Sequence, residues 1–358
     1  MNILFAGGGT GGHLFPALAL AEEIKQLRPD ASITFLGTPD HLEARVVPER
    51  GFPFQGVPSV GLRKTPQGIV RFVWTIVRAV RVARALLKQD TPDLVVGTGG
   101  YVSAPALLAA QSLGIPTAIQ EQNAHPGQAN RLFAKRAKLV ATAFDQATRE
   151  LHGKKFGNPI RILPSKEEAR TALGIPPEAK VLLVTGGSGG AKRINEAVLR
   201  IHPRLLREGW TVFHVAGERD LPRLTKPEDP RYHLMGFSDR MLELVAAADF
   251  MVSRAGASTL AELTAAGTPA LLVPYPYAGA HQKANADELV AAGAAGFLAD
   301  EELDSLENRL FPLLENREEM APKCRALGRP NATRELAEAL LALADGDRSH
   351  NRFQQEGA

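Results

Sequence analysis

A glycine-rich turn that ends in a histidine is the first feature that could do chemistry. Gly7-Gly8-Gly9-Thr10-Gly11-Gly12-His13 follows an apolar segment and opens a helical pattern. Backbone amides at such a helix start favour an anion. The helix dipole there disfavours imidazolium, so His13 would stay neutral and could act as a general base for a sugar hydroxyl. A histidine that only caps the helix or hydrogen-bonds a loop fits the spacing equally well.

Two common nucleotide-binding classes fit this turn poorly. Gly7, Gly9 and Gly12 satisfy the dinucleotide fingerprint, but the next apolar segment ends in Leu36-Gly37-Thr38, without the acidic residue that would hold a ribose. A phosphate-binding P-loop would need Lys and then Ser or Thr where His13 and Leu14 stand. The sequence therefore disfavours both nicotinamide and NTPase chemistry.

A second glycine turn, Thr185-Gly186-Gly187-Ser188-Gly189-Gly190, again lies between an apolar strand pattern and a helix. Ligands of parallel sheets bind at the carboxyl ends of the strands. We therefore expect two amide-lined turns, one per half of the chain, that face each other across a cleft. A tight turn for helix packing is the alternative for either turn taken alone.

Two further polar clusters follow predicted strands. In the segment 253–262, Ser258 and Glu262 share one helix face, where a carboxylate could accept two hydrogen bonds from a ribose diol. Plain helix capping is the alternative. Glu121, Asn123 and His125 follow another strand and place polar groups at the edge of the first sheet, with loop hydrogen bonding as the alternative.

The helical segment 68–88 carries an unusual stripe. Steps of three and four residues place Arg71, Trp74, Arg78 and Arg81 in one row, and Val70 and Val77 flank the tryptophan. An aromatic anchor among cations is typical of a helix that contacts an anionic membrane surface. A tryptophan that packs between domains, with solvated arginines, is the alternative.

The elements that must position these residues alternate in a regular order. Short apolar strands, such as 3–6 and 181–184, are each followed by a helical pattern, which predicts parallel sheets covered on both faces. The order restarts at Lys180, so we predict two doubly wound α/β domains, residues 1–157 and 158–331. The boundary falls at Gly157-Asn158-Pro159, because Gly and Asn-Pro disfavour helices and central strands. An Ala- and Leu-rich helix over about 332–345 and a polar tail over 346–358 follow.

Composition narrows the class of protein. No stretch of the 358 residues approaches the roughly twenty apolar residues of a membrane span, and no export signal is visible at the N-terminus. The single cysteine, Cys324, cannot form an internal disulfide, so the cytoplasm is the expected compartment. The net charge of +3, without basic runs among aromatic residues, gives no indication of a nucleic-acid partner.

Taken together, the motifs closely resemble the MurG family, glycosyltransferase family 28, over nearly the whole chain. The segments that carry the resemblance keep their order and spacing: Gly8–His13, Gly100–Ser103, Glu121–Asn123, Gly157–Arg161, Gly186–Ser188, Gly256–Glu262, His281-Gln282 and Asn285-Ala286. The resemblance implies the GT-B fold, in which two Rossmann-like domains face across a cleft and the last helix packs back on the first domain.

The resemblance also implies roles for individual residues. Glu262 would hold the ribose, and Ser188 would lie near the diphosphate. His13 would be the candidate base, and Tyr101 and Glu121 would lie on the acceptor side. The full set of implied substrate-binding residues is Thr10, Gly11, Gly12, Asn123, Arg161, Ser188, Phe237, Ser238, Ala257, Ser258, Thr259, Glu262 and Gln282.

The implied reaction is an inverting transfer of N-acetylglucosamine from UDP-N-acetylglucosamine to undecaprenyl-diphosphate-linked muramyl-pentapeptide, at the cytoplasmic face of the cell membrane, in peptidoglycan synthesis. No protein-bound metal ion is expected. Gln120, Gly189 and Lys192 depart from the usual family pattern, which expects His, Gln and Arg there. A UDP-N-acetylglucosamine 2-epimerase and a non-catalytic nucleotide-sugar-binding protein are the alternatives.

Overall fold

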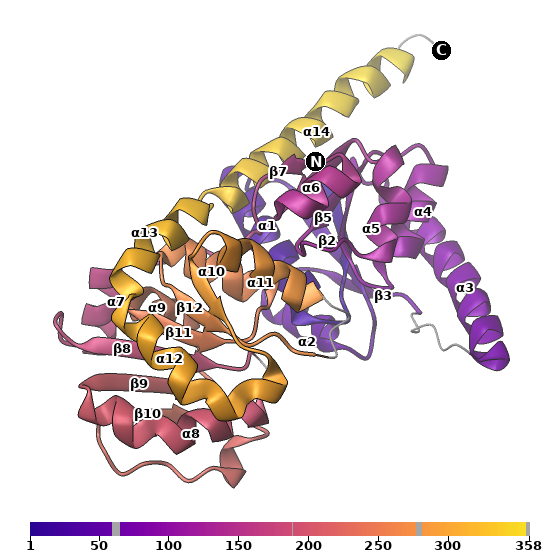
Figure 1. Cartoon of the computed structure of the whole chain (residues 1–358). Helices are drawn as coiled ribbons and strands as arrows, with labels where there is room; N and C mark the ends of the chain where they lie inside the picture. Colours follow the sequence, from indigo (N-terminus) through magenta and orange to yellow (C-terminus); the bar gives the residue numbers. More distant parts are fainter. Residues whose placement is uncertain (59–64, 188, 277–280, 356–358) are drawn as a thin grey trace. The chain divides into compact units, whose positions relative to one another are not determined.

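The chain divides into two units in the computed structural model (Figure 1), which describes residues 1–58, 65–187, 189–276 and 281–355. The N-terminal unit contains Met1–Arg161 and Asn331–Ala358, and the C-terminal unit contains Ile162–Pro330. Each unit is described by itself below. Among the described residues, no helix is both long enough and apolar enough to span a bilayer.

The N-terminal unit is built on a seven-stranded sheet whose paired strands all run parallel, in the order β3-β2-β1-β4-β5-β6-β7. The order reverses between β1 and β4, so these two strands define its topological switch point. The strands are β1 (Asn2–Gly7), β2 (Ser32–Gly37), β3 (Phe54–Gly56), β4 (Leu94–Gly99), β5 (Thr117–Glu121), β6 (Leu139–Thr142) and β7 (Lys154–Lys155).

Helices cover both faces of this sheet. Along β1, Ile3 and Phe5 join one apolar cluster, whereas Leu4 and Ala6 join another, because successive strand residues point to opposite faces. Both faces are therefore buried, which explains why the strand is apolar throughout. The helices are α1 (Gly11–Leu27), α2 (Leu42–Glu49), α3 (Pro66–Asp90), α4 (Ser103–Ser112), α5 (Gln128–Phe133), η1 (Ala134–Arg136), α6 (Asp145–Leu151) and α14 (Ala332–Gln355).

The C-terminal helix α14 belongs to the N-terminal unit. Leu336 and Leu340 share an apolar cluster with Ile24 of α1. The backbone N–H of Ile160 donates to Thr333 Oγ1 over 2.9 Å, and the Thr333 hydroxyl donates back to the Ile160 carbonyl. These bonds keep the chain in the N-terminal unit as far as Arg161, four residues beyond the boundary expected from the sequence. The helix also continues to Gln355, through part of the expected polar tail.

The C-terminal unit repeats the plan with six parallel strands in the order β10-β9-β8-β11-β12-β13. Its switch point lies between β8 and β11. The strands are β8 (Lys180–Thr185), β9 (Trp210–Val215), β10 (Tyr232–Met235), β11 (Phe250–Ser253), β12 (Ala270–Leu272) and β13 (Ala295–Phe297). The helices are α7 (Lys166–Leu173), α8 (Lys192–Arg207), η2 (Leu221–Arg223), α9 (Met241–Ala247), α10 (Ala257–Ala266), α11 (His281–Ala291), η3 (Asp300–Ser305), α12 (Leu306–Glu315) and α13 (Arg317–Leu327). The two doubly wound parallel sheets predicted from the sequence are thus confirmed.

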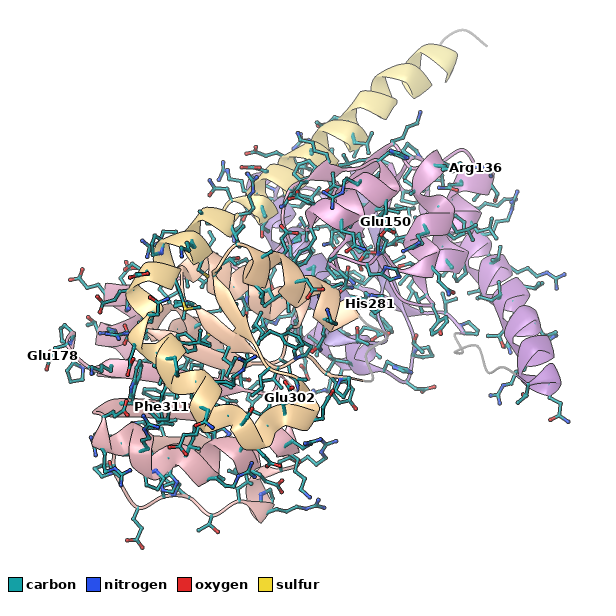
Figure 2. The ribbon with its side chains drawn as sticks, in the orientation of Figure 1. Arg136, Glu150, Glu178, His281, Glu302 and Phe311 are labelled. Carbon is teal, nitrogen blue, oxygen red and sulfur yellow. The ribbon has the colours of Figure 1, made fainter. Side chains whose placement is uncertain are left out.

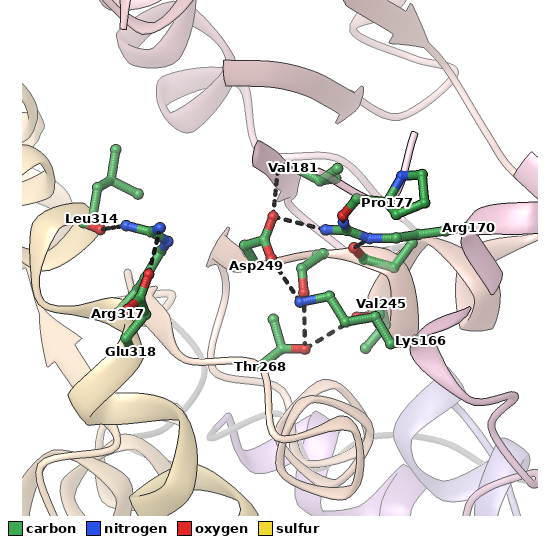
Figure 3. A network of polar contacts seen from close by, with 12 residues as sticks. Lys166, Arg170, Pro177, Val181, Val245, Asp249, Thr268, Leu314, Arg317 and Glu318 are labelled. Carbon is green, nitrogen blue, oxygen red and sulfur yellow. Dashed lines mark hydrogen bonds and ion pairs between the residues drawn. The ribbon is translucent and has the colours of Figure 1, made fainter. Parts of the chain in front are cut away.

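A polar network fixes α7 at the amino ends of β8 and β11 (Figure 3). Asp249, the residue before β11, accepts hydrogen bonds from Val181 N over 2.7 Å, from Lys166 Nζ over 2.6 Å and from Arg170 Nη2 over 2.9 Å. One carboxylate therefore joins α7 to both central strands. The carboxyl ends of the same strands, at the opposite edge of the sheet, carry the polar turns described next.

Candidate active site

Two polar turns lie side by side at the switch point of the C-terminal sheet. Thr185, the last residue of β8, pairs in register with Ser253, the last residue of β11. The glycine turn 186–190 follows the first strand, and the N-terminus of α10 follows the second. The carboxyl ends of parallel strands at a switch point are where ligands bind in such sheets.

The glycine turn has a shape that only glycine allows. Gly187 and Gly190 have φ values of +81° and +72°, in the left-handed region. A Cβ atom on Gly190 would collide with the carbonyl of Ala216. The Thr185 hydroxyl oxygen accepts a hydrogen bond from Gly187 N over 3.1 Å. Ser188, expected near the diphosphate, lies outside the described residues.

The start of α10 offers unsatisfied hydrogen-bonding groups. Gly256 precedes the helix and has no side chain to cap it, so the first amides of α10 have no side-chain acceptor from that position. The hydroxyl of Ser258 is buried and has no hydrogen-bond partner among the described residues. Such a helix start is suited to an anion. Glu262 lies half-buried one turn further along the same helix, Ala257 is buried and Thr259 is half-buried.

Arg254, the first residue after β11, connects this strand end to the segment after β12 and to Asp300. Its guanidinium donates to the carbonyls of Val273 and Pro274 over 3.1 and 3.3 Å and pairs with Asp300 at 2.7 Å, with both side chains of the ion pair buried. The segment after these carbonyls reaches Tyr275, whose N–H donates to Gln282 Oε1 over 2.8 Å. The Gln282 amide nitrogen is then the group that could donate to a ligand. Sequence reasoning gave Arg254 no role, although a charge directly after a buried strand was a usable signal.

Phe237 and Ser238 follow β10, two strands away from β8 in the same sheet. The Phe237 ring is exposed, and the Ser238 hydroxyl accepts a hydrogen bond from Arg240 N over 3.2 Å. An exposed aromatic ring at this position can stack on a planar ligand.

A buried histidine network lies behind the glycine turn. His214 Nε2 is 3.0 Å from Asn195 Oδ1, and its Nδ1 is 2.8 Å from the Tyr232 hydroxyl. Asn195 Nδ2 donates to the Ala216 carbonyl over 2.9 Å and to Asp220 over 3.2 Å. Burial lowers the pKa of His214 to about 4, so the ring is neutral at pH 7. Sequence reasoning missed this network, because its members come from separate elements with no shared motif.

In the N-terminal unit, His13 lies at the corresponding switch point. Gly7 of β1 lies opposite Gly99 of β4, after a shift in register between Ala6 and Gly7. The half-buried ring of His13 has Nδ1 at 3.1 Å from the Gly8 carbonyl oxygen and at 3.1 Å from Thr10 Oγ1. Because a carbonyl can only accept, the contact with Gly8 places the proton on Nδ1 and makes Nε2 the acceptor nitrogen. The ring does not cap α1; it is held by the turn itself.

The ring of His13 also restricts which residue can end β4. A Cβ atom on Gly99 would stand 2.8 Å from Cδ2 of the imidazole. Gly11 and Gly12 begin α1, and Tyr101, two residues after Gly99, is exposed. The structure therefore brings the glycine turn, His13 and the residues after β4 together at one edge of the sheet.

Glu121 organises the loop after β5. Its buried carboxylate accepts from Asn123 N over 2.9 Å, from Gly127 N over 2.8 Å and from Asn130 Nδ2 over 2.8 Å. These bonds favour loop organisation over direct contact with an acceptor, and they set the position of half-buried Asn123. Arg131 of α5 then pairs at 2.7 Å with Glu150 of α6; Glu150 is labelled in Figure 2.

The remaining residues singled out from the sequence differ in their burial and contacts. Gln120, which stands where the family usually has histidine, is buried. Its Nε2 donates to Asn158 Oδ1 over 3.1 Å. Arg161 is exposed as the last residue of its segment in the N-terminal unit. His125 is exposed beside Arg131. His281, labelled in Figure 2, begins α11.

The row of residues on α3 faces solvent. Trp74 is 63% exposed and Val77 is 44% exposed, and the Arg78 guanidinium lies 5.6 Å from the centre of the Trp74 ring. Arg71 and Arg81 are exposed as well. The side chain of Val70 lies outside the description. Trp74 is therefore no part of a packed core within its unit.

Two protein-family models match this chain, one in each half. Residues 3–142 match the glycosyltransferase family 28 N-terminal domain, and residues 181–340 match the glycosyltransferase family 28 C-terminal domain. The chain belongs to glycosyltransferase family 28. It is 42% identical, over 98% of both chains, to the UDP-N-acetylglucosamine–N-acetylmuramyl-(pentapeptide) pyrophosphoryl-undecaprenol N-acetylglucosamine transferase of Salinibacter ruber (strain DSM 13855 / M31).

Solved structures agree with the family 28 assignment. The crystal structure of Acinetobacter baumannii MurG matches with a TM-score of 0.74 and 30% identity, over 95% of this chain and 99% of that chain. UDP-GlcNAc 2-epimerase from Neisseria meningitidis, bound to UDP-GlcNAc, matches with a TM-score of 0.64 and 17% identity, over 95% of this chain and 100% of that chain. At that identity the epimerase shows a shared fold only. The family membership makes the protein a glycosyltransferase with the GT-B fold.

Proposed function

We propose that this family 28 glycosyltransferase moves N-acetylglucosamine from UDP-N-acetylglucosamine to the muramyl 4-hydroxyl of undecaprenyl-diphosphate-linked MurNAc-pentapeptide, with inversion at the anomeric carbon. The observation that carries the proposal is the shared carboxyl edge of β8 and β11, whose last residues pair in register and are followed by a glycine turn and an uncapped helix start. The name of the Salinibacter relative supports the choice of donor and acceptor. The reaction belongs to peptidoglycan synthesis.

The donor site follows from the groups at that edge. The first amides of α10 and the buried Ser258 hydroxyl bind the diphosphate, and the dipole of α10 stabilises the charge that develops as UDP leaves. Glu262 accepts hydrogen bonds from the ribose diol. Phe237 stacks on the uracil, and the Gln282 amide, oriented by Tyr275 N, contacts the sugar.

His13 acts as the general base. Its Nε2 takes the proton from the acceptor hydroxyl while the new oxygen–carbon bond forms at the anomeric carbon. The bond from that carbon to the phosphate oxygen breaks, and UDP leaves with the electron pair. One displacement needs one base and no covalent intermediate.

The proposal includes no protein-bound metal ion. The charge of the leaving diphosphate is stabilised instead by the backbone amides and the dipole of α10. Turnover that persists in excess EDTA is the expected result. A strict requirement for Mg²⁺ or Mn²⁺, with a stoichiometric ion on the protein, would show that this part of the proposal is wrong.

The exposed row on α3 is proposed to contact the anionic surface of the cytoplasmic leaflet, where the lipid-linked acceptor resides. Trp74 supplies an amphipathic anchor, and Arg71, Arg78 and Arg81 supply the charge that anionic headgroups attract. Peripheral attachment of this kind would bring the enzyme to its acceptor.

The decisive assay incubates the protein with UDP-N-acetylglucosamine and lipid-linked muramyl-pentapeptide and follows both substrates by mass spectrometry. The expected result is a glycosylated lipid and an equal amount of UDP. Conversion of the donor to its 2-epimer without glycosylated lipid would favour an epimerase instead. Donor binding without turnover of any acceptor would favour a non-catalytic binding protein. A His13→Ala variant that keeps full turnover would remove the base assignment alone.

A further inference from the structure

A buried glutamate that the sequence motifs did not include lies beneath the first glycine turn. Glu43 of α2 is 1% exposed. Its Oε1 accepts from Thr38 N over 3.0 Å and from Gly9 N over 3.1 Å, and its Oε2 is 3.2 Å from the same Gly9 N. Burying a carboxylate is costly unless hydrogen bonds replace its water, and here two backbone amides do so.

The chain makes room for this side chain with glycines at two places. A Cβ atom on Gly8 would collide with Glu43 Oε1. A Cβ atom on Gly37, at the end of β2, would stand 2.6 Å from Glu43 Cγ. The turn also needs Gly9 at φ +81° to aim its N–H at the carboxylate. The glycine pattern of the first turn is thus explained by Glu43 as well as by any ligand.

One peptide group connects Glu43 to His13. The Gly8 carbonyl and the Gly9 N–H belong to the same planar peptide unit. The carboxylate accepts from its N–H end at 3.1 Å, and His13 Nδ1 donates to its C=O end at 3.1 Å. We propose that Glu43 is a positioning residue for the general base, acting through the Gly8–Gly9 peptide group in place of a direct carboxylate–histidine contact. This inference rests on the proposed role of His13.

The arrangement would help His13 in two ways. Hydrogen bonds in a chain polarise one another, so an N–H held by a carboxylate makes the carbonyl of the same peptide a stronger acceptor. That holds the Nδ1–H tautomer and stabilises the imidazolium formed when Nε2 takes a proton. The N-terminal dipole of α1 opposes a positive ring at this position. The buried negative charge of Glu43, beneath the same helix start, offsets that opposition.

The same contacts separate the two glycine turns by function. The Gly9 amide is occupied by Glu43, and a carboxylate beneath the turn repels a phosphate. The Gly9 amide of the first turn is therefore already used to hold the base, whereas the proposed diphosphate site is the start of α10. The sequence had suggested anion binding at both turns.

The test compares Glu43→Gln with the control Glu23→Gln. Glu23 is a buried glutamate of α1 whose carboxylate lies 4.0 Å from Arg334, and no hydrogen bond between it and the Gly8–Gly9 peptide group is seen in the described part of the chain. The pH titration of the His13 ring is followed by NMR of histidine-labelled protein, together with kcat and the donor KM. In Glu43→Gln, the His13 titration midpoint should fall and kcat should drop on the order of tenfold, below the roughly 10²–10⁴-fold supplied by a general base. The donor KM should stay within about twofold, and Glu23→Gln should change none of these.

The outcomes separate this inference from the proposed function. Full turnover in His13→Ala would refute the base, and with it the role given to Glu43. Loss of turnover in His13→Ala, with neither kcat nor the titration changed in Glu43→Gln, would overturn the role of Glu43 alone. A rise only in donor KM would also overturn it, because that pattern marks a structural support. If Glu43→Gln fails to fold, Glu43→Met removes the charge with a side chain of similar length, and an unmoved His13 titration in that variant would equally refute the coupling.

Discussion

Gly190 and Gly217 meet backbone to backbone: a Cβ atom on Gly217 would stand 2.6 Å from the Cα and 2.8 Å from the N of Gly190. Both have positive φ, +72° and +91°. Asn195, from its side chain, holds the carbonyl of Ala216 immediately before Gly217. The shape of the proposed diphosphate turn is therefore set by a second turn after β9 as well as by its own sequence.

Gly217→Ala should raise the KM for the donor several-fold. The added Cβ must push against Gly190 and strain a left-handed residue, at a cost of about 1–3 kcal/mol in the free energy of unfolding. Gly209→Ala is the matched control, because Gly209 has φ +83° and open space around its Cβ position. It should lose similar stability and keep the donor KM. Equal donor KM values in the two variants would show that the contact with Gly190 is unimportant.

Stability should fall in acid because His214 is buried as a neutral ring. Its folded pKa is about 4 against an ordinary value of 6.5, so between these pH values the unfolded chain binds a proton that the folded chain does not. The stability contributed by the neutral ring is full above pH 6.5 and is lost as the pH falls towards 4. The loss amounts to about 3 kcal/mol.

The measurement uses urea unfolding followed by tryptophan fluorescence in a Trp74→Phe background, where buried Trp210 of β9 is the remaining tryptophan and reports on the C-terminal unit. His214→Gln should flatten the pH dependence between pH 6.5 and 4. His202→Gln, a partly exposed histidine of α8, should leave it unchanged. A His214→Gln protein with the original pH dependence would contradict the assignment.

Arg254→Ala should destabilise the C-terminal unit by about 1–3 kcal/mol, because the carbonyls of Val273 and Pro274 lose their donor and the buried Asp300 keeps only the more exposed Arg193, at 3.2 Å, as its cation. The same Trp210 fluorescence measures the loss. Arg200→Ala removes an exposed ion pair with Asp304 and should cost no more than about 1 kcal/mol. Similar costs for both substitutions would mean that the Arg254 pair does not support the loop.

Trp74→Ala combined with Arg78→Glu should reduce binding to vesicles that contain anionic lipid, since it removes the anchor and reverses a charge. UDP binding should be unchanged, because the donor site lies in the other unit. Arg334→Glu is the control, an equal charge reversal on α14. Binding is measured by vesicle sedimentation. Undiminished binding by the double variant would show that the α3 row does not contact the membrane.

Periodicity sufficed for the framework of the molecule. The strands predicted over 3–6 and 181–184 are both buried. Those features depend on local pattern alone. The location of the polar turns at strand ends follows from the same pattern, because parallel strands bring their carboxyl ends to one edge.

The supporting residues could not be predicted in this way. Glu43, His214 and Arg254 act through partners distant in sequence, and a buried charge has no periodic signature until its partners are known. The domain boundary was displaced for a related reason, since the bond between Ile160 and Thr333 joins segments 173 residues apart. Residue spacing predicts where a glycine turn lies, but only the packed structure shows that one of its amides, Gly9 N, is already bound by Glu43.

The central claim, that the donor diphosphate binds at the start of α10, is tested most directly by a crystal structure with bound UDP. We expect phosphate oxygens within hydrogen-bonding distance of the first α10 amides and the Ser258 hydroxyl, and the Glu262 carboxylate hydrogen-bonded to the ribose diol. A diphosphate bound instead on the turn 7–12, above Glu43, or at any site remote from Ser258 and Glu262, would contradict it.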